Sequence, residues 1–151
     1  MKNFRGVTAL ELLVSIAILL LAAWFIGGLF SGFRESTRLT EAHTALVGLL
    51  RDARARTLAS ESNSVYGVHF ETNLASLFKG AVYNSSDSSN ENYVLPNTVE
   101  ISAINLAGGA QDIVFARLSG LASASGDVTV RSVSDSSKTK TITIIGSGAV
   151  K

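Results

Sequence analysis

Residues 12–33 read LLVSIAILLLAAWFIGGLFSGF, a run of 22 residues without a charged side chain. As an α-helix this run extends about 33 Å at about 1.5 Å per residue, enough to cross a hydrocarbon core of about 30 Å. It is apolar on all sides, which excludes a surface helix with one hydrated face. The part of the chain that follows is too short to bury so long a rod. The sequence therefore predicts a transmembrane helix.

The composition of the chain excludes several classes of protein. The 151 residues include 13 Lys and Arg against 12 Asp and Glu, two histidines and no cysteine. This near-neutral balance argues against a general nucleic-acid binder, and the lack of cysteine excludes disulfides and thiolate metal sites. His43 and His69 are too few for a multi-histidine metal centre. Because catalytic motifs such as G-x-S-x-G and H-E-x-x-H are also absent, we expect no enzyme, cofactor or metal.

The charges that flank the apolar run indicate its orientation. Lys2 and Arg5 precede it, which favours an N-terminus in the cytoplasm and translocation of the rest of the chain. The run is longer than the apolar region of a secretory signal, about 7–15 residues, and no small-x-small cleavage site follows it. We therefore expect a retained, single-pass membrane protein with an extracytoplasmic C-terminal domain.

Glu11 is the unusual residue at the start of this apolar helix. A carboxylate at the middle of a bilayer costs about 3 kcal/mol on insertion scales, and such a residue is a candidate for function. Alternatively, Glu11 lies close enough to the helix end to reach the lipid headgroups, aided by the positive N-terminus of the helix. The physical chemistry of the residue leaves both interpretations open.

The segment KNFRGVTALELLVSIAILLLA, residues 2–22, resembles the N-terminus of type IV prepilins and type II secretion pseudopilins. In that family a short basic leader ends in Gly, Thr is the second mature residue and Glu the fifth. The corresponding residues of this chain are Gly6, Thr8 and Glu11. The resemblance implies that prepilin peptidase cleaves between Gly6 and Val7 and methylates the Val7 amine. It also implies that Glu11, with Thr8 beside it, serves assembly by neutralising the N-terminal amine of an adjacent subunit.

Two positions depart from the family pattern. Val7 stands where the first mature residue is usually Phe. Gly28, beside Gly27, stands where many major pilins have a proline. Two glycines lower helix stability by about 2 kcal/mol relative to alanines, which favours local unwinding in a filament. Close packing of helices at small residues is the alternative, and both stay open.

Residues 34–59 keep the helical period but become amphipathic. One stripe about 100° wide on this helix carries Leu39, Ala42, Leu46, Leu49, Leu50, Ala53 and Thr57. This stripe predicts a helix face that packs against a domain. Arg51, Arg54 and Arg56 are interpreted as part of a solvated face and not as a nucleic-acid site, because Arg56 points elsewhere and Asp52 dilutes the cluster.

The period of the apolar residues changes to two after the turn at residues 60–64. Residues 65–79 predict a β-hairpin, with His69 on the polar face of its strand. Further strands are predicted at 99–106, 112–118, 127–133 and 139–145. Residues 84–92 predict a polar loop, in which Asp87 and Glu91 lack the fixed acidic spacing of a known calcium loop.

These elements predict an α+β fold in which a long N-terminal transmembrane helix packs against a C-terminal antiparallel sheet domain, as in pilins. The predicted parts are a leader peptide at 1–6, a transmembrane and filament-core helix at 7–33, its amphipathic continuation at 34–59 and a β-rich globular domain at 60–151.

The order of segments across residues 51–151 resembles H-type minor pseudopilins and FimT-like minor pilins. The segments are RDAR, YGVHF, LPNTVEIS, DIVFARLSG and TITIIGSGAVK. The resemblance implies a structural subunit, more consistent with a minor than a major one, of a type IV pilus-like filament or a type II secretion pseudopilus. Its partners would be other pilin subunits, prepilin peptidase, the inner-membrane assembly platform and, before assembly, membrane lipid. It would begin as a single-pass protein of the bacterial inner membrane.

Three alternatives stay open. One is a FimT-like minor pilin for DNA uptake, although the tail GSGAVK carries only Lys151 where such subunits are expected to have arginines, so DNA is not the favoured partner. A second is a major pilin. A third, from another class of protein, is an uncleaved single-span membrane protein with an extracytoplasmic β domain.

Overall fold

The computed structural model describes residues 8–151, with the side chains of residues 25–33 left out. The chain divides into two compact units, Met1–Glu35 and Ser36–Lys151. Helix α1 (Ala9–Leu58) contributes residues to both units. All of the β-strands belong to the second unit.

The apolar stripe predicted along residues 34–59 is confirmed. Six of its seven residues are buried, and Leu49 is partly buried against the same core; the six are Leu39, Ala42, Leu46, Leu50, Ala53 and Thr57. Thr57 also fastens the helix end to the first strand, since its hydroxyl donates to the carbonyl of Ala53 at 2.8 Å and accepts from the amide of Tyr66 at 2.9 Å. The helical period therefore identified the face that packs on the domain.

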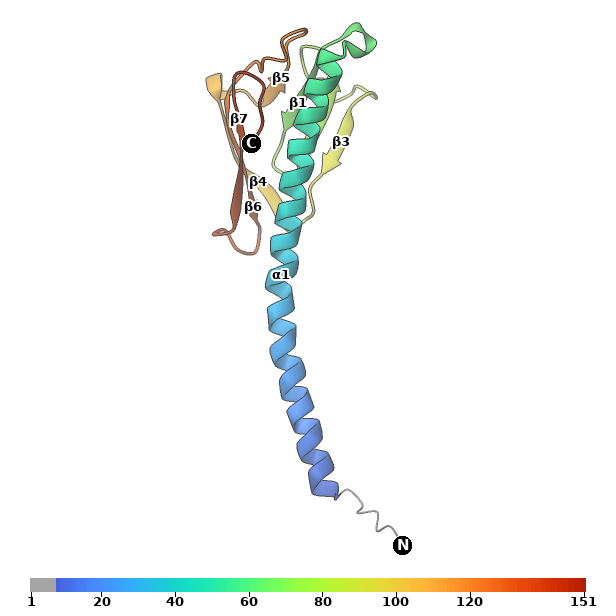
Figure 1. Cartoon of the computed structure of the whole chain (residues 1–151), viewed down its shortest axis with the longest axis vertical. Helices are drawn as coiled ribbons and strands as arrows, with labels where there is room; N and C mark the ends of the chain where they lie inside the picture. The colour runs from blue at the N-terminus through green and yellow to red at the C-terminus, as the bar shows by residue number, and fades with distance from the viewer. Residues whose placement is uncertain (1–7) are drawn as a thin grey trace. The chain divides into compact units, whose positions relative to one another are not determined.

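The strands form two antiparallel sheets, against which the C-terminal part of α1 packs (Figure 1). The first sheet has the order β3-β2-β1-β5 and consists of β1 (Tyr66–Phe70), β2 (Leu74–Lys79), β3 (Glu91–Val94) and β5 (Asp112–Val114). The second has the order β4-β6-β7 and consists of β4 (Val99–Leu106), β6 (Gly126–Ser132) and β7 (Thr139–Ile144). Short 3-10 turns occupy Glu61–Asn63 and Ala107–Gly109.

The first sheet grows from the predicted hairpin, which is confirmed. Val68 of β1 pairs with Leu77 of β2 on one side and with Ile113 of β5 on the other. The predicted strand at 112–118 is shorter than expected, since β5 ends at Val114. Strand β3 was not predicted; it is an edge strand with mostly exposed side chains and therefore lacks the alternation that marks a half-buried strand.

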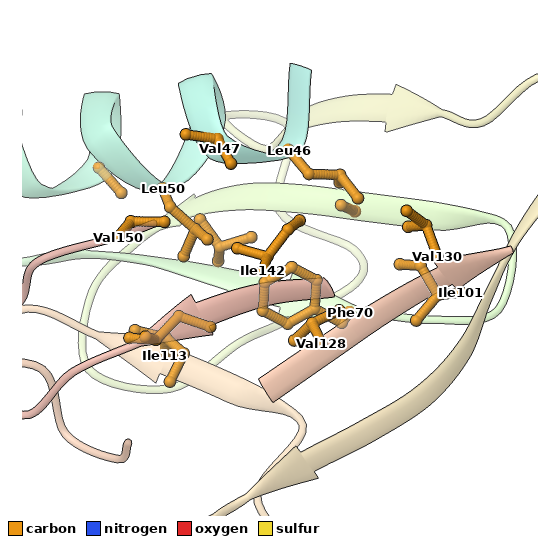
Figure 2. Close-up of a cluster of buried hydrophobic side chains, with 14 of the residues drawn as sticks. Leu46, Val47, Leu50, Phe70, Ile101, Ile113, Val128, Val130, Ile142 and Val150 are labelled. Carbon is orange, nitrogen blue, oxygen red and sulfur yellow. The ribbon is translucent and has the colours of Figure 1, made fainter. Parts of the chain in front are cut away.

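The second sheet follows the sequence prediction within one residue at each strand end, and it packs with the first sheet and α1 around one core. Figure 2 shows Leu46 and Leu50 pointing from α1 toward Phe70 of the first sheet and Ile142 of the second. All four side chains are almost completely buried. The burial of these side chains is the dominant stabilising term of the unit.

The predicted fold class, a long transmembrane helix packed against one antiparallel sheet, is wrong. The strands divide into two sheets because β5 returns to pair with β1, while β4, β6 and β7 pair among themselves. In addition, none of the helical residues that the structure describes form a segment long and apolar enough to cross a membrane. The predicted span extends into residues 25–33, whose side chains lie outside the described part. Residues 9–24 alone are shorter than the roughly 20 apolar residues that a crossing needs.

Candidate functional site

The start of α1 is fixed by a cap that involves two of the predicted assembly residues. The backbone amide of Glu11 donates to the hydroxyl of Thr8 at 3.3 Å, and the amide of Leu12 donates to the Thr8 carbonyl at 3.1 Å. A threonine hydroxyl that accepts from the third helical amide is the usual N-cap arrangement. The sequence T-x-x-E thus begins a helix and places the carboxylate of Glu11 in its first turn, where the positive end of the helix dipole favours it.

The apolar side chains that follow Glu11 are exposed to solvent. Every residue from 8 to 24 is exposed, with Leu10 at 74% and Trp24 at 78%. Soluble monomers rarely expose so much contiguous apolar surface, and where they do it marks an interaction site. Within 8–24 Glu11 is the only charged residue. A partner that covered this surface would therefore bury a single carboxylate, which is costly unless a cation accompanies it.

The remaining predicted residues of this region are not tested. Gly6 and Val7, the predicted cleavage and methylation site, lie outside the described residues. Gly27 and Gly28, the predicted site of helix unwinding, fall in the stretch 25–33 whose side chains are not described. Cleavage, methylation and unwinding therefore stay predictions.

Arg51 is exposed, as the interpretation of a solvated face predicts, and Arg54 is partly buried, but both also donate hydrogen bonds to distant parts of the chain, which was not predicted. Arg51 donates to the carbonyl of Val150 at 3.3 Å. Arg54 donates through Nε to the carbonyl of Gly120 at 3.1 Å and through Nη2 to that of Ser147 at 3.4 Å. These acceptors are 66 to 99 residues away in sequence, so helix periodicity could not reveal them. The two arginines hold the C-terminal segment against the end of α1.

Arg56 behaves differently from its two neighbours, because it has carboxylate partners. It forms ion pairs with Asp52 at 2.7 Å and Glu91 at 2.5 Å, and its guanidinium lies 5.9 Å from the ring centre of Tyr66. Hydrogen bonds to Glu91 and then to Asp52 raise its pKa above the ordinary value. The pair with Glu91 joins α1 to the edge strand β3. Such a partly exposed pair contributes on the order of 1 kcal/mol or less.

His69 is the centre of a small polar and aromatic cluster. Its Nδ1 bonds to the carboxylate of Asp112, its Nε2 lies 3.4 Å from Glu71, and its ring stacks on that of Tyr83 at 4.0 Å. His69 pairs with the polar residues Ser76 and Asp112 on the neighbouring strands, in keeping with its predicted place on the polar face, but these contacts leave its side chain only 12% exposed. Within residues 8–151 no group of three or more acidic, histidine or cysteine side chains is arranged to hold a metal ion.

One exposed residue has an unusual backbone that the sequence did not reveal. Leu118 has φ 69°, in the left-handed region, and its side chain is 88% exposed. The loop around it is held by hydrogen bonds from the Gly120 amide to the Ala116 carbonyl and from Arg117 to the side chain of Asn63, at 2.8 and 2.7 Å. Leucine in this conformation is strained, and strain of this kind is concentrated at functional sites.

We expect Leu118→Asn to stabilise the protein by about 1 kcal/mol, because asparagine tolerates the left-handed region and the exposed leucine contributes little packing. The free energy of unfolding measured in urea checks this. Leu121→Asn is the matched control, since Leu121 is also exposed but is not among the residues with positive φ. Its effect should stay within about 0.5 kcal/mol. Equal effects of the two substitutions would contradict the assignment of strain to Leu118.

Comparison of the chain with models of protein families, with curated proteins and with solved structures finds no match.

Proposed function

We propose that this chain is a structural subunit, more consistent with a minor than a major one, of a type IV pilus-like filament or a type II secretion pseudopilus. The proposal assigns it no catalytic activity. Prepilin peptidase processes it between Gly6 and Val7, and the assembly platform adds it to a filament through its N-terminal helix. Its partners are other pilin-type subunits, and the finished filament lies outside the cytoplasm.

The observation that carries the proposal is the exposed apolar surface of residues 8–24 with one carboxylate at its start. Packing against the same segment of other subunits removes this surface from water, at about 25 cal/mol for each Å² of apolar area. The lone acid then selects the register, because only an arrangement that brings a cation to Glu11 avoids the cost of a buried, unpaired charge. The free amine that cleavage leaves on Val7 of a neighbouring subunit supplies that cation.

The experiment that tests the proposal is an intact-mass measurement of the chain purified from its native cells. A mature chain that begins at methylated Val7 is expected. The variant Gly6→Leu serves as the control, because it should accumulate with the leader attached. Wild-type protein that retains Met1 would contradict the proposal and favour the uncleaved single-span alternative.

A further inference from the structure

A cavity of about 350 Å³ lies in the unit Ser36–Lys151, beside the last turns of α1. Arg51, Arg54 and Leu58 line it from the helix, and residues 148–150 line it from the C-terminal segment. Its walls are therefore apolar, apart from backbone groups and two guanidinium groups.

The two guanidinium groups at this cavity lack a carboxylate partner within the described part of the chain. Arg51 and Arg54 donate only to the carbonyls of Val150, Gly120 and Ser147. Arg56, two residues after Arg54 on the helix, has two carboxylate partners by contrast. A guanidinium carries five N–H donors and binds carboxylates through pairs of them, so both arginines keep donors for an anion.

One exposed leucine, Leu58, lines the cavity, and two others, Leu118 and Leu121, belong to the loop of Gly120. Leu58 is 41% exposed, and Leu121 is 50% exposed. A methyl group placed on Gly120 would lie 3.2 Å from Cδ2 of Leu58 and 3.0 Å from Nε of Arg54, so the loop that carries Leu118 and Leu121 touches the cavity wall. The backbone of this loop holds Leu118 in its strained, exposed position. Aliphatic and arginine side chains that gather in this way are typical of protein interfaces.

We propose that this helix-end surface, defined by Arg51, Arg54, Leu58, Leu118 and Leu121, binds a protein segment that presents a carboxylate beside aliphatic side chains. The carboxylate enters the cavity and pairs with the two arginines, and its aliphatic neighbours cover the leucines. A small anion would satisfy the arginines but would leave the leucines exposed. The surface belongs to the unit Ser36–Lys151 and shares no residue with the N-terminal segment, so the proposal does not rest on filament assembly.

The test is a titration of the full chain, in a nonionic maltoside detergent, with the peptide acetyl-Leu-Glu-Leu-Leu-Glu-Leu-amide. NMR signals of the arginine Nε–H groups and the leucine methyl groups report binding. The peptide should shift the signals of Arg51, Arg54 and Leu118. The peptide with Gln in place of Glu should bind with an affinity about fivefold lower, or lower still, since charge-assisted hydrogen bonds are lost.

Two variants of the chain complete the experiment. Arg51→Gln should weaken the Glu peptide about fivefold, and Leu118→Asn should weaken it while stabilising the fold. Arg38→Gln is the matched control on the same helix, because Arg38 is exposed and distant in sequence from the cavity, and it should leave the affinity unchanged.

Three results would overturn the proposal: no shift of these signals, equal affinity for the Glu and Gln peptides, or saturation of the same signals by inorganic phosphate as tightly as by the peptide. The last result would identify a simple anion site. Glu11→Ala should bind the peptide like the wild type, so failure here is distinct from failure of the filament proposal.

Discussion

Replacing Glu11 by alanine is expected to leave the chain at its normal level in cells and to remove it from sheared filaments. In the proposed filament the substitution leaves the amine of the neighbouring subunit buried without a counter-charge. Loss of one partner of a buried pair costs about 3–5 kcal/mol, which corresponds to a hundredfold or greater loss in an association equilibrium. Immunoblots of whole cells measure the level of the chain, and immunoblots of the sheared-filament fraction measure its incorporation.

The structure indicates that this substitution removes the carboxylate without disturbing the start of the helix. The cap of α1 uses the backbone amide of Glu11 and the hydroxyl of Thr8, so an alanine at position 11 keeps it. Ser15→Ala is the matched control, because it removes one exposed hydroxyl that bonds only to the Glu11 carbonyl, at 2.8 Å. This variant should assemble normally. Filaments that contain Glu11→Ala at the wild-type level would end the argument that Glu11 sets the register.

Replacing Gly148 by alanine is expected to destabilise the unit Ser36–Lys151 by about 2–5 kcal/mol, the sum of a left-handed backbone penalty and of overpacking. Gly148 has φ 78°, and a Cβ there would lie 1.9 Å from the carbonyl oxygen of Gly120 and 2.8 Å from Nε of Arg54. That carbonyl is the one that Arg54 binds. The segment 146–150 must therefore move away from the helix end to admit a methyl group.

Gly146→Ala is the control for this prediction. Gly146 lies in the same segment, but a Cβ there has no atom within 4 Å and its φ is not positive. Its effect should stay within about 1 kcal/mol. Urea unfolding measures both variants. Similar stability of the two would show that the close approach of Gly148 to Gly120 is not required.

The sequence predicted secondary structure well wherever an element buries one face, because its apolar residues then repeat with a fixed period. The spacing from Leu39 to Thr57 identified the face of α1 that packs on the domain. Alternation in the segments that became β1, β4, β6 and β7 located those strands to within a residue or so. Both kinds of pattern follow from local geometry, since side chains repeat every 3.6 residues in a helix and every two in a strand.

The candidate surface could not be predicted, because its contacts join distant parts of the chain. The acceptors of Arg51 and Arg54 are 66 to 99 residues away, and nothing in the helical neighbourhood of these two arginines indicates them. The left-handed backbone of Leu118 was not predicted either. Leucine does not favour it, and it occurs in a loop with local hydrogen bonds from the Ser119 amide to the Arg117 carbonyl and from the Gly120 amide to the Ala116 carbonyl, together with the distant bond from Arg117 to Asn63.

By itself, then, the sequence determined the helix face, most of the strands and the position of a lone acid at the head of an apolar segment, because each depends on neighbours a few residues apart. Tertiary structure decided that the strands form two sheets, through the pairing of Val68 with Ile113, and that the C-terminal segment is held on Arg51 and Arg54. These features depend on which distant backbone groups form hydrogen bonds with one another once the common core has formed, and the spacing of neighbouring residues does not predict these pairings.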